Sequence, residues 1–172
     1  MKFRIIPTII ILFFVVTFII FFKGLKHSNI YTPNINLEKK VPSLVLKSFD
    51  DNSEFISENI FHKNKFYLMN IWASWCIPCK DEHKFLMKLK KNEKIELIGL
   101  NYKDSNNNAK NFLREMGNPY NKIFKDKDGT SSIIWGAYGV PESFLIHKNK
   151  IIKRFIGPIN NENLMEIEKI IK

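Results

Sequence analysis

The chain has 172 residues and a formal net charge of +10, and 45% of its residues are apolar and 13% aromatic. This apolar content excludes a disordered chain, and two cysteines are too few for a disulfide-dense secreted scaffold or a four-thiolate zinc site. The length suits one domain, and no block of basic residues interleaved with aromatics predicts nucleic-acid binding.

The first element is an apolar segment over 5–22, which is 18 residues long and carries no charge. As a helix it would be about 27 Å long, just enough to cross the hydrocarbon core of a bilayer. A cleaved signal peptide, the alternative, has a shorter apolar region followed by small residues, whereas this run ends in Lys23-Gly24-Leu25-Lys26-His27. We therefore expect a transmembrane signal anchor over 5–22, after a short end over 1–4.

The charges beside this segment do not orient it, because two basic residues precede it and two follow it. Residues 23–40 are polar and rich in Asn, and they show no period of a helix or strand. They predict a tether with a root-mean-square reach of roughly 25 Å. A globular domain is expected over 41–172.

Within this domain the hydrophobic pattern predicts alternating strands and helices. The segment over 66–72 is almost continuously apolar, as in a strand buried on both faces. The other expected elements are a strand over 42–49, a helix over 77–91, a strand over 96–102, a helix from a Ser105 cap to Met116 and Gly117, a hairpin of 143–147 and 150–156, and a helix over 161–172 with Leu164, Ile167, Ile170 and Ile171 inward. This order predicts an α/β sandwich with a mixed sheet.

Both cysteines lie in one motif, Trp72–Lys80, with the sequence WASWCIPCK. A buried strand runs into a short turn and then a helix, so Cys76 is expected at a helix N-terminus, where free N–H groups and the helix dipole favour a thiolate. Two intervening residues place Cys79 one turn further, close enough to bond to Cys76. The motif predicts a redox pair in which Cys76 attacks a disulfide and Cys79 resolves the mixed disulfide.

Two cysteines at this spacing could also serve in haem attachment, in a metal site or in a structural disulfide. A haem-attachment CxxCH motif needs a histidine after the second cysteine, where this chain has Lys80. A metal site formed by Cys76, Cys79 and His83 stays open. So does a purely structural disulfide, although a ring of four residues constrains little of the unfolded chain.

The motif Trp72–Lys80 resembles the active site of the thioredoxin superfamily. Further segments resemble the DsbE/CcmG family, the thiol:disulfide interchange proteins of cytochrome c biogenesis: Glu82-His83, Asn101–Asp104, Gly117–Tyr120 and Gly136–Ile146. The resemblance covers the N-terminal anchor and nearly all of the domain. It implies a thioredoxin-like domain over 41–172, with a central mixed sheet flanked by helices, behind a single transmembrane helix.

The resemblance also implies an activity and a location. Members of the family are thiol-disulfide oxidoreductases anchored in the inner membrane with their domain in the periplasm, which would place residues 1–4 in the cytoplasm. They reduce the CxxCH cysteines of apocytochrome c, or partner proteins in its maturation, for haem attachment. They receive electrons from a membrane thiol reductase. They need no cofactor besides the redox-active disulfide, here Cys76–Cys79, and no metal.

Two other functions remain open at this point. One is a membrane-tethered thioredoxin-like reductase with other extracytoplasmic clients. The other is a copper-carrying thioredoxin-like protein, although such carriers usually place three residues between their cysteines and this chain has two.

The family likeness implies a cis peptide between Val140 and Pro141, facing the cysteines. The neighbouring backbone could then pair with an extended client segment as an added strand. A trans-proline that opens a strand is the alternative. Glu142 is expected either to select basic or polar clients or to face solvent, and Trp75 is expected to be partly exposed and to shield the disulfide.

Glu82 is an acid on an otherwise apolar helical face, which it shares with the second cysteine, Leu86 and Leu89. Thioredoxins usually carry a buried aspartate in the strand before the motif, where this chain has Asn70. An amide cannot accept a proton at neutral pH. We therefore expect Glu82 to act as the general base for Cys79. The alternative is an acid that complements the helix dipole.

Overall fold

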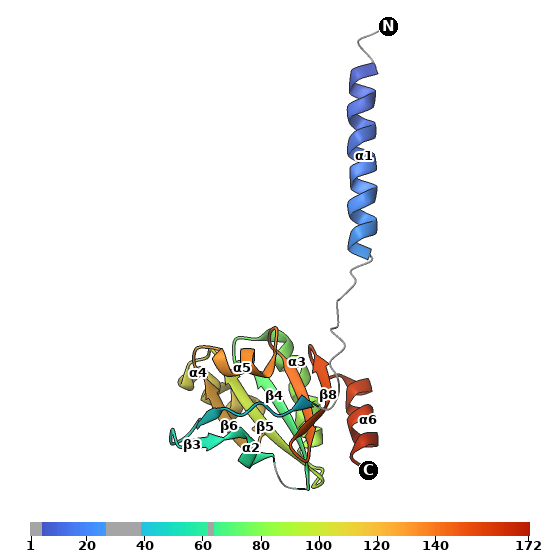
Figure 1. Cartoon of the computed structure of the whole chain (residues 1–172). Coiled ribbons are helices and arrows are strands. Elements are labelled where there is room, and N and C mark those ends of the chain that lie inside the picture. The colour runs from blue at the N-terminus through green and yellow to red at the C-terminus, as the bar shows by residue number, and fades with distance from the viewer. Residues whose placement is uncertain (1–4, 27–38, 62–63) are drawn as a thin grey trace. The chain divides into compact units, whose positions relative to one another are not determined.

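The computed structural model describes residues 5–26, 39–61 and 64–172 (Figure 1). The chain divides into two compact units, Met1–Ile35 and Asn36–Lys172. Most of the expected tether, and the short end over 1–4, lie outside the described residues.

The first unit contains one long helix, α1 (Ile5–Lys26). The predicted apolar helix over 5–22 is confirmed and continues for about one more turn, because a single glycine at position 24 does not end a helix. Its stretch Ile6–Gly24 is long and apolar enough to cross a membrane, and none of it is buried. The helix therefore meets the length and composition that a membrane anchor needs.

The second unit is built on one mixed sheet of eight strands, in the order β1-β8-β7-β4-β5-β6-β2-β3. The pairs β4–β5 and β5–β6 are parallel, whereas β4–β7 and β7–β8 are antiparallel. In chain order the elements are β1 (Lys39–Lys40), β2 (Val45–Ser48), β3 (Glu54–Ile56), α2 (Ser57–Ile60), β4 (Phe66–Trp72), α3 (Ile77–Leu89), β5 (Ile95–Tyr102), α4 (Asn106–Met116), β6 (Lys122–Asp126), α5 (Thr130–Trp135), β7 (Glu142–His147), β8 (Lys150–Ile156) and α6 (Asn161–Ile170). The predicted α/β architecture with a mixed sheet is confirmed.

Strand β4 lies in the middle of the sheet and is buried on both faces, as its apolar run predicts. Successive side chains of a strand point to opposite faces. Leu68 and Trp72 accordingly pack in one core cluster with residues of α3, α4 and α6. Met69 and Ile71 pack in a second cluster, which includes Trp135 of α5. Helices therefore cover both faces of the sheet, and β4 is tightly packed at the end that leads into the cysteine motif.

Elements with strong local signals match the prediction closely. Helix α4 begins after Ser105, whose side chain accepts a hydrogen bond from the N–H of Asn108, and ends at Gly117. The hairpin β7–β8 turns at Lys148 and Asn149, which both have positive φ as a two-residue hairpin turn requires. Local hydrogen bonds and turn geometry are enough to specify these boundaries.

Elements with weak local signals were missed or misjudged. The strand predicted over 42–49 is only four residues long as β2, and the short elements β1, β3, α2, β6 and α5 were not predicted. Helix α6 ends at Ile170, whose exposed fraction is 38%, so the prediction that this residue faces inward was wrong. Segments of two to six residues are too short to show a period, so contacts with neighbouring elements define them.

Gly99 on β5 lies close against the rings of Trp72 and Tyr120. A Cβ at this position would lie 2.8 Å from Trp72 Nε1 and 3.0 Å from Tyr120 Cγ. The two rings are buried and stacked, with centroids 5.4 Å apart, so they have little room to move. We expect Gly99→Ala to lower the free energy of unfolding by about 1–3 kcal/mol.

This prediction can be checked by urea unfolding of the full chain in detergent. Gly139→Ala is the matched control, because a Cβ there would meet nothing within 4 Å. The control should change the free energy of unfolding by less than about 0.5 kcal/mol. Equal effects of the two variants would contradict the prediction.

Candidate active site

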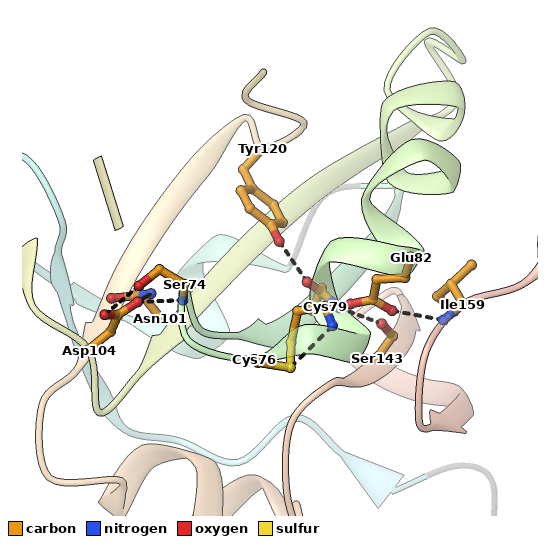
Figure 2. The surroundings of a disulfide bond; sticks show 10 residues. Ser74, Cys76, Cys79, Glu82, Asn101, Asp104, Tyr120, Ser143 and Ile159 are labelled. Carbon is orange, nitrogen blue, oxygen red and sulfur yellow. Dashed lines mark hydrogen bonds between the residues drawn. A yellow bond between two sulfur atoms is a disulfide. The ribbon is translucent and has the colours of Figure 1, made fainter. Parts of the chain in front are cut away.

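The two cysteines lie where β4 passes into α3 and form a disulfide bond (Figure 2). Cys76 is the N-cap residue of α3, and its Sγ accepts a hydrogen bond of 3.2 Å from the N–H of Cys79. Pro78 lies in the first turn, where its missing N–H costs little. The bond between the two cysteines and the place of Cys76 at the helix N-terminus are therefore both as the sequence predicts.

The turn before Cys76 is held by the loop that follows β5. The carboxylate of Asp104 accepts hydrogen bonds from the N–H of Ser74 at 2.6 Å and from its hydroxyl at 2.8 Å (Figure 2). Asn101 donates to the same carboxylate at 3.1 Å, and the indole N–H of Trp75 donates to the carbonyl of Lys103 at 3.1 Å. Because β4 and β5 are parallel neighbours, their carboxyl ends meet here. Sequence reasoning noted the Asn101–Asp104 segment but not this contact.

Glu82 lies one turn beyond Cys79 and is fully buried. Its Oε1 accepts a hydrogen bond of 2.9 Å from Asn70 Nδ2, and its Oε2 accepts one of 2.8 Å from the N–H of Ile159. Burial raises the pKa of Glu82 to about 7, and the two hydrogen bonds offset only part of that rise. The carboxyl group can therefore take up or release a proton near neutral pH.

Asn70, on β4, orients the carboxyl group of Glu82. The hydroxyl of Tyr120 donates to Asn70 Oδ1 at 2.7 Å, which directs Nδ2 toward Glu82 and toward the hydroxyl oxygen of Ser143 at 2.9 Å. Burial, and then the nearby charge of Glu82, raises the pKa of Tyr120 well above its usual value, so its hydroxyl remains a donor. Tyr120 and Ser143 lie in segments that carry the family resemblance, but the sequence did not predict their contacts with Asn70, and it did not indicate Ile159. All three residues come from segments distant from the cysteine motif.

The Val140–Pro141 peptide bond is cis, as the family likeness implies. Pro141 is buried, and Val140 is half-buried against both core clusters, one of which contains the two cysteines. The next residue, Glu142, pairs with Ile71 near the end of β4. The loop therefore lies at the same end of the sheet as the cysteine motif.

Trp75 and Glu142 differ sharply in exposure. Trp75 has an exposed fraction of 55%, which fits the partial exposure that the sequence predicts. Glu142 has an exposed fraction of only 2%, so the prediction that it faces clients or solvent does not fit this inward position. Its Oε1 accepts hydrogen bonds from the N–H groups of Tyr138 and Gly139, and its Oε2 accepts hydrogen bonds from Arg154.

His83, which the sequence left open as a metal ligand, is also buried, with an exposed fraction of 2%. Its Nε2 lies 2.9 Å from the carbonyl oxygen of Gly117, and its ring contacts Phe112 edge to face. Burial lowers the pKa of His83. Within 5–26, 39–61 and 64–172, no group of three or more His, Cys, Asp and Glu residues could hold a metal ion.

Comparison with known proteins places this arrangement in context. The Redoxin family matches residues 36–171. The chain is 45% identical over 105 residues to thiol:disulfide interchange protein CycY of Rhizobium leguminosarum bv. viciae, covering 60% of this chain and 56% of the relative. It is 34% identical over 165 residues to thiol:disulfide interchange protein DsbE of Yersinia pestis, covering 93% of this chain and 86% of the relative. The match thus spans just over half of CycY, and it spans 66% of DsbE from Escherichia coli K12.

A solved structure shows the same fold. The thioredoxin domain of a thiol-disulfide oxidoreductase from Bacteroides vulgatus superposes with a TM-score of 0.65 at 17% identity, covering 79% of this chain and 98% of that domain. The expected thioredoxin-like fold, with a mixed sheet flanked by helices, is thereby confirmed.

Proposed function

The chain has a Redoxin domain and belongs to the DsbE/CcmG family of thiol:disulfide interchange proteins, and on this basis we propose that it is a membrane-anchored thiol-disulfide oxidoreductase of the periplasm. The observation that carries the proposal is the Cys76–Cys79 disulfide at the N-terminus of α3. A disulfide that closes so small a ring contributes little to stability through the unfolded chain. Its position at a helix N-terminus suits exchange chemistry instead.

In the reduced protein, the thiolate of Cys76 attacks one sulfur of a client disulfide. A bond forms between Cys76 and the client, the client disulfide breaks, and the leaving client thiolate takes a proton from water. Cys79 then gives its proton to Glu82 and attacks Cys76 Sγ. The Cys76–Cys79 disulfide forms and the bond from Cys76 to the client breaks. The second client sulfur leaves as a thiolate that takes a proton from water, and Glu82 returns the proton of Cys79 to water. Two electrons pass to the client, so a membrane thiol reductase must return two electrons to the domain.

The geometry distinguishes the roles of the two cysteines. Cys76 Sγ already accepts a hydrogen bond from the first turn of α3, and the same donor would stabilise a thiolate. Cys79 lies within the helix, one turn before the carboxyl group of Glu82. These contacts support Cys76 as the attacking cysteine and Cys79 as the resolving one.

Glu82 serves as the general base for Cys79 in this proposal. A base works best when its pKa lies near the working pH, and burial brings the pKa of Glu82 to about 7. The alternative, an acid that complements the helix dipole, needs no burial, whereas Glu82 is fully enclosed. Its contacts with Asn70 and Ile159 hold the carboxyl group in place.

The family and the exposed surface near the disulfide support a proposal for the clients and the location. Helix α1 would anchor the chain in the inner membrane, with the domain in the periplasm. The clients would be apocytochrome c, through its CxxCH cysteines, or proteins of cytochrome c maturation. Exposed apolar side chains of the motif, those of Trp75 and Ile77, suit a protein client. An extended client segment would pair with the backbone of Val140 beside Pro141, because the carbonyl of Pro141 already accepts a hydrogen bond from Gly157.

A Cys79→Ser variant tests this proposal. Without the resolving thiol, the mixed disulfide at Cys76 should accumulate, and adducts can be purified from membranes of cells that make the full chain. We expect apocytochrome c segments with CxxCH cysteines among the adducts. The double variant Cys76→Ser with Cys79→Ser is the control and should trap nothing. Recovery of unrelated clients alone would favour a reductase of broader range, and stoichiometric copper binding without any exchange would favour a copper carrier.

A further inference from the structure

We propose that the buried ion pair between Glu142 and Arg154 is a positioning device, which holds the loop Tyr138–Pro141 and the Tyr138 ring in the shape that receives a client segment. This inference rests on the proposed function and deepens it. It assigns a role to Arg154, and it gives Glu142 a role different from direct client contact.

The carboxylate of Glu142 holds the backbone of the loop. Its Oε1 accepts hydrogen bonds from the N–H of Tyr138 at 2.6 Å and from the N–H of Gly139 at 3.2 Å. These two residues directly precede Val140, where a client strand would pair. Both hydrogen bonds are partly buried, and the carboxylate that accepts them is only 2% exposed.

Arg154, on β8, supports the same loop through Glu142 and through the Tyr138 ring. Its Nε donates to Glu142 Oε2 at 2.8 Å and its Nη2 donates to the same oxygen. Its guanidinium carbon lies 4.6 Å from the centroid of the Tyr138 ring and 5.4 Å from that of Phe144. The side chain of Arg154 is only 6% exposed, whereas Tyr138 is 70% exposed. One face of the tyrosine ring is therefore backed by a cation, and much of the ring remains available to a client.

The pair connects the loop to the rigid part of the sheet. Glu142 is the first residue of β7, and its backbone pairs with Ile71 of β4 and Ile156 of β8. Arg154 lies on β8, two residues before Ile156. A loop fixed to these two strands is preorganised. Binding of a client therefore costs less conformational entropy of the protein.

A purely structural purpose does not account for this arrangement. Apolar residues of similar volume often replace a buried ion pair without loss of stability. Such residues would occupy the same positions on the paired strands β7 and β8, but they would offer no acceptor to the two loop N–H groups. The acceptor oxygen of residue 142 is thus the feature that the positioning role requires.

Two neutral double variants isolate that oxygen. E142Q/R154M and E142M/R154M both remove the two charges and keep similar volumes, but only the first keeps an acceptor for Tyr138 and Gly139. The full chain in detergent is assayed for reduction of a disulfide-bonded peptide. We expect E142M/R154M to raise KM about tenfold with little change in kcat, because the two loop N–H groups lose their acceptor and the loop is no longer ordered. E142Q/R154M keeps the acceptor and loses the cation behind the Tyr138 ring, so it should raise KM only about twofold to fivefold.

Amide hydrogen exchange gives a readout that needs no activity. The amides of Tyr138 and Gly139 should be protected in the original chain and in E142Q/R154M, and they should exchange at least about tenfold faster in E142M/R154M. Lys153→Met is the matched control, because Lys153 is the neighbouring basic residue on β8 and pairs instead with Glu166 at 2.6 Å. This control should change neither KM nor the exchange of the two amides.

Equal KM values and equal amide exchange in the two double variants would overturn the inference. Should E142M/R154M fail to fold, Tyr138→Ala takes its place, since an exposed side chain can be truncated without unfolding the domain. It should raise KM about tenfold, and an unchanged KM would overturn the role of the ring. If dithiothreitol does not reduce the disulfide of the original chain, the proposed function itself fails, while the amide readout still tests the loop.

Discussion

Replacing Cys76 by serine is expected to abolish thiol-disulfide exchange, with a loss of at least about a thousandfold that brings the rate to background. The N-terminus of α3 stabilises the thiolate of a cysteine, whereas a serine hydroxyl does not ionise near neutral pH. Cys79 is not expected to take over, because it lies within α3 and is not the N-cap residue that the free N–H groups of the first turn face. The measurement is turnover of a disulfide-bonded peptide by the full chain with dithiothreitol as electron source.

Cys79→Ser is the comparison for this prediction. It should lose turnover as well, but it should still release one client thiol per chain in a single turnover and retain the client as a mixed disulfide. If instead Cys79→Ser shows no first step and Cys76→Ser keeps it, the roles of the two cysteines are reversed.

Replacing Glu82 by glutamine is expected to remove a pH dependence of stability. Burial raises the pKa of Glu82 from 4.5 to about 7, so the folded chain holds this proton more tightly than the unfolded chain. Folding therefore takes up a proton between these pH values, and the free energy of unfolding falls as the pH rises from about 4.5 to about 7. From pH 5 to pH 8 the loss amounts to about 2–3 kcal/mol. Above pH 7 both states are ionised at this residue, and the loss is complete.

Urea unfolding of the full chain in detergent at pH 5 and pH 8 checks this expectation. Glutamine does not ionise, so the variant should lose about 2–3 kcal/mol less than the original chain over this interval. Glu168→Gln makes the same chemical change on an exposed residue of α6 and should follow the original chain. If Glu82→Gln shows the same change with pH as the original chain, then the carboxyl group is already ionised at pH 5.

The same variant tests the proposed general base. The rate at which Cys79 resolves the mixed disulfide should increase with pH through about 7 in the original chain, as Glu82 loses its proton. In Glu82→Gln we expect this rate to be about a hundredfold lower and no longer to depend on that titration. Rapid-quench kinetics of a preformed mixed disulfide measure it. An unchanged rate at every pH would exclude the base role.

Several features of the site could be predicted from short segments of sequence alone. The apolar run over 66–72, the turn after it and the proline in the first turn of α3 together place Cys76 as the N-cap, as the structure shows. The Ser105 cap and the turn at Lys148 and Asn149 were equally clear. In each case the deciding interaction lies within a few residues, either as a hydrogen bond to the next turn or as a backbone conformation that few residues adopt.

Other features were decided only by tertiary contacts. The sequence placed Glu82 on an apolar face, but its burial and raised pKa depend on Asn70 and on Ile159, which is 77 residues away. The sequence could not tell whether Glu142 points outward, because its partner Arg154 lies on the next strand. Carboxyl groups that would otherwise prefer water are held inside by donors from distant segments. Local patterns determine where the capped helices and the long apolar strand begin, whereas the direction and charge of a buried acid depend on which residues the fold places against it.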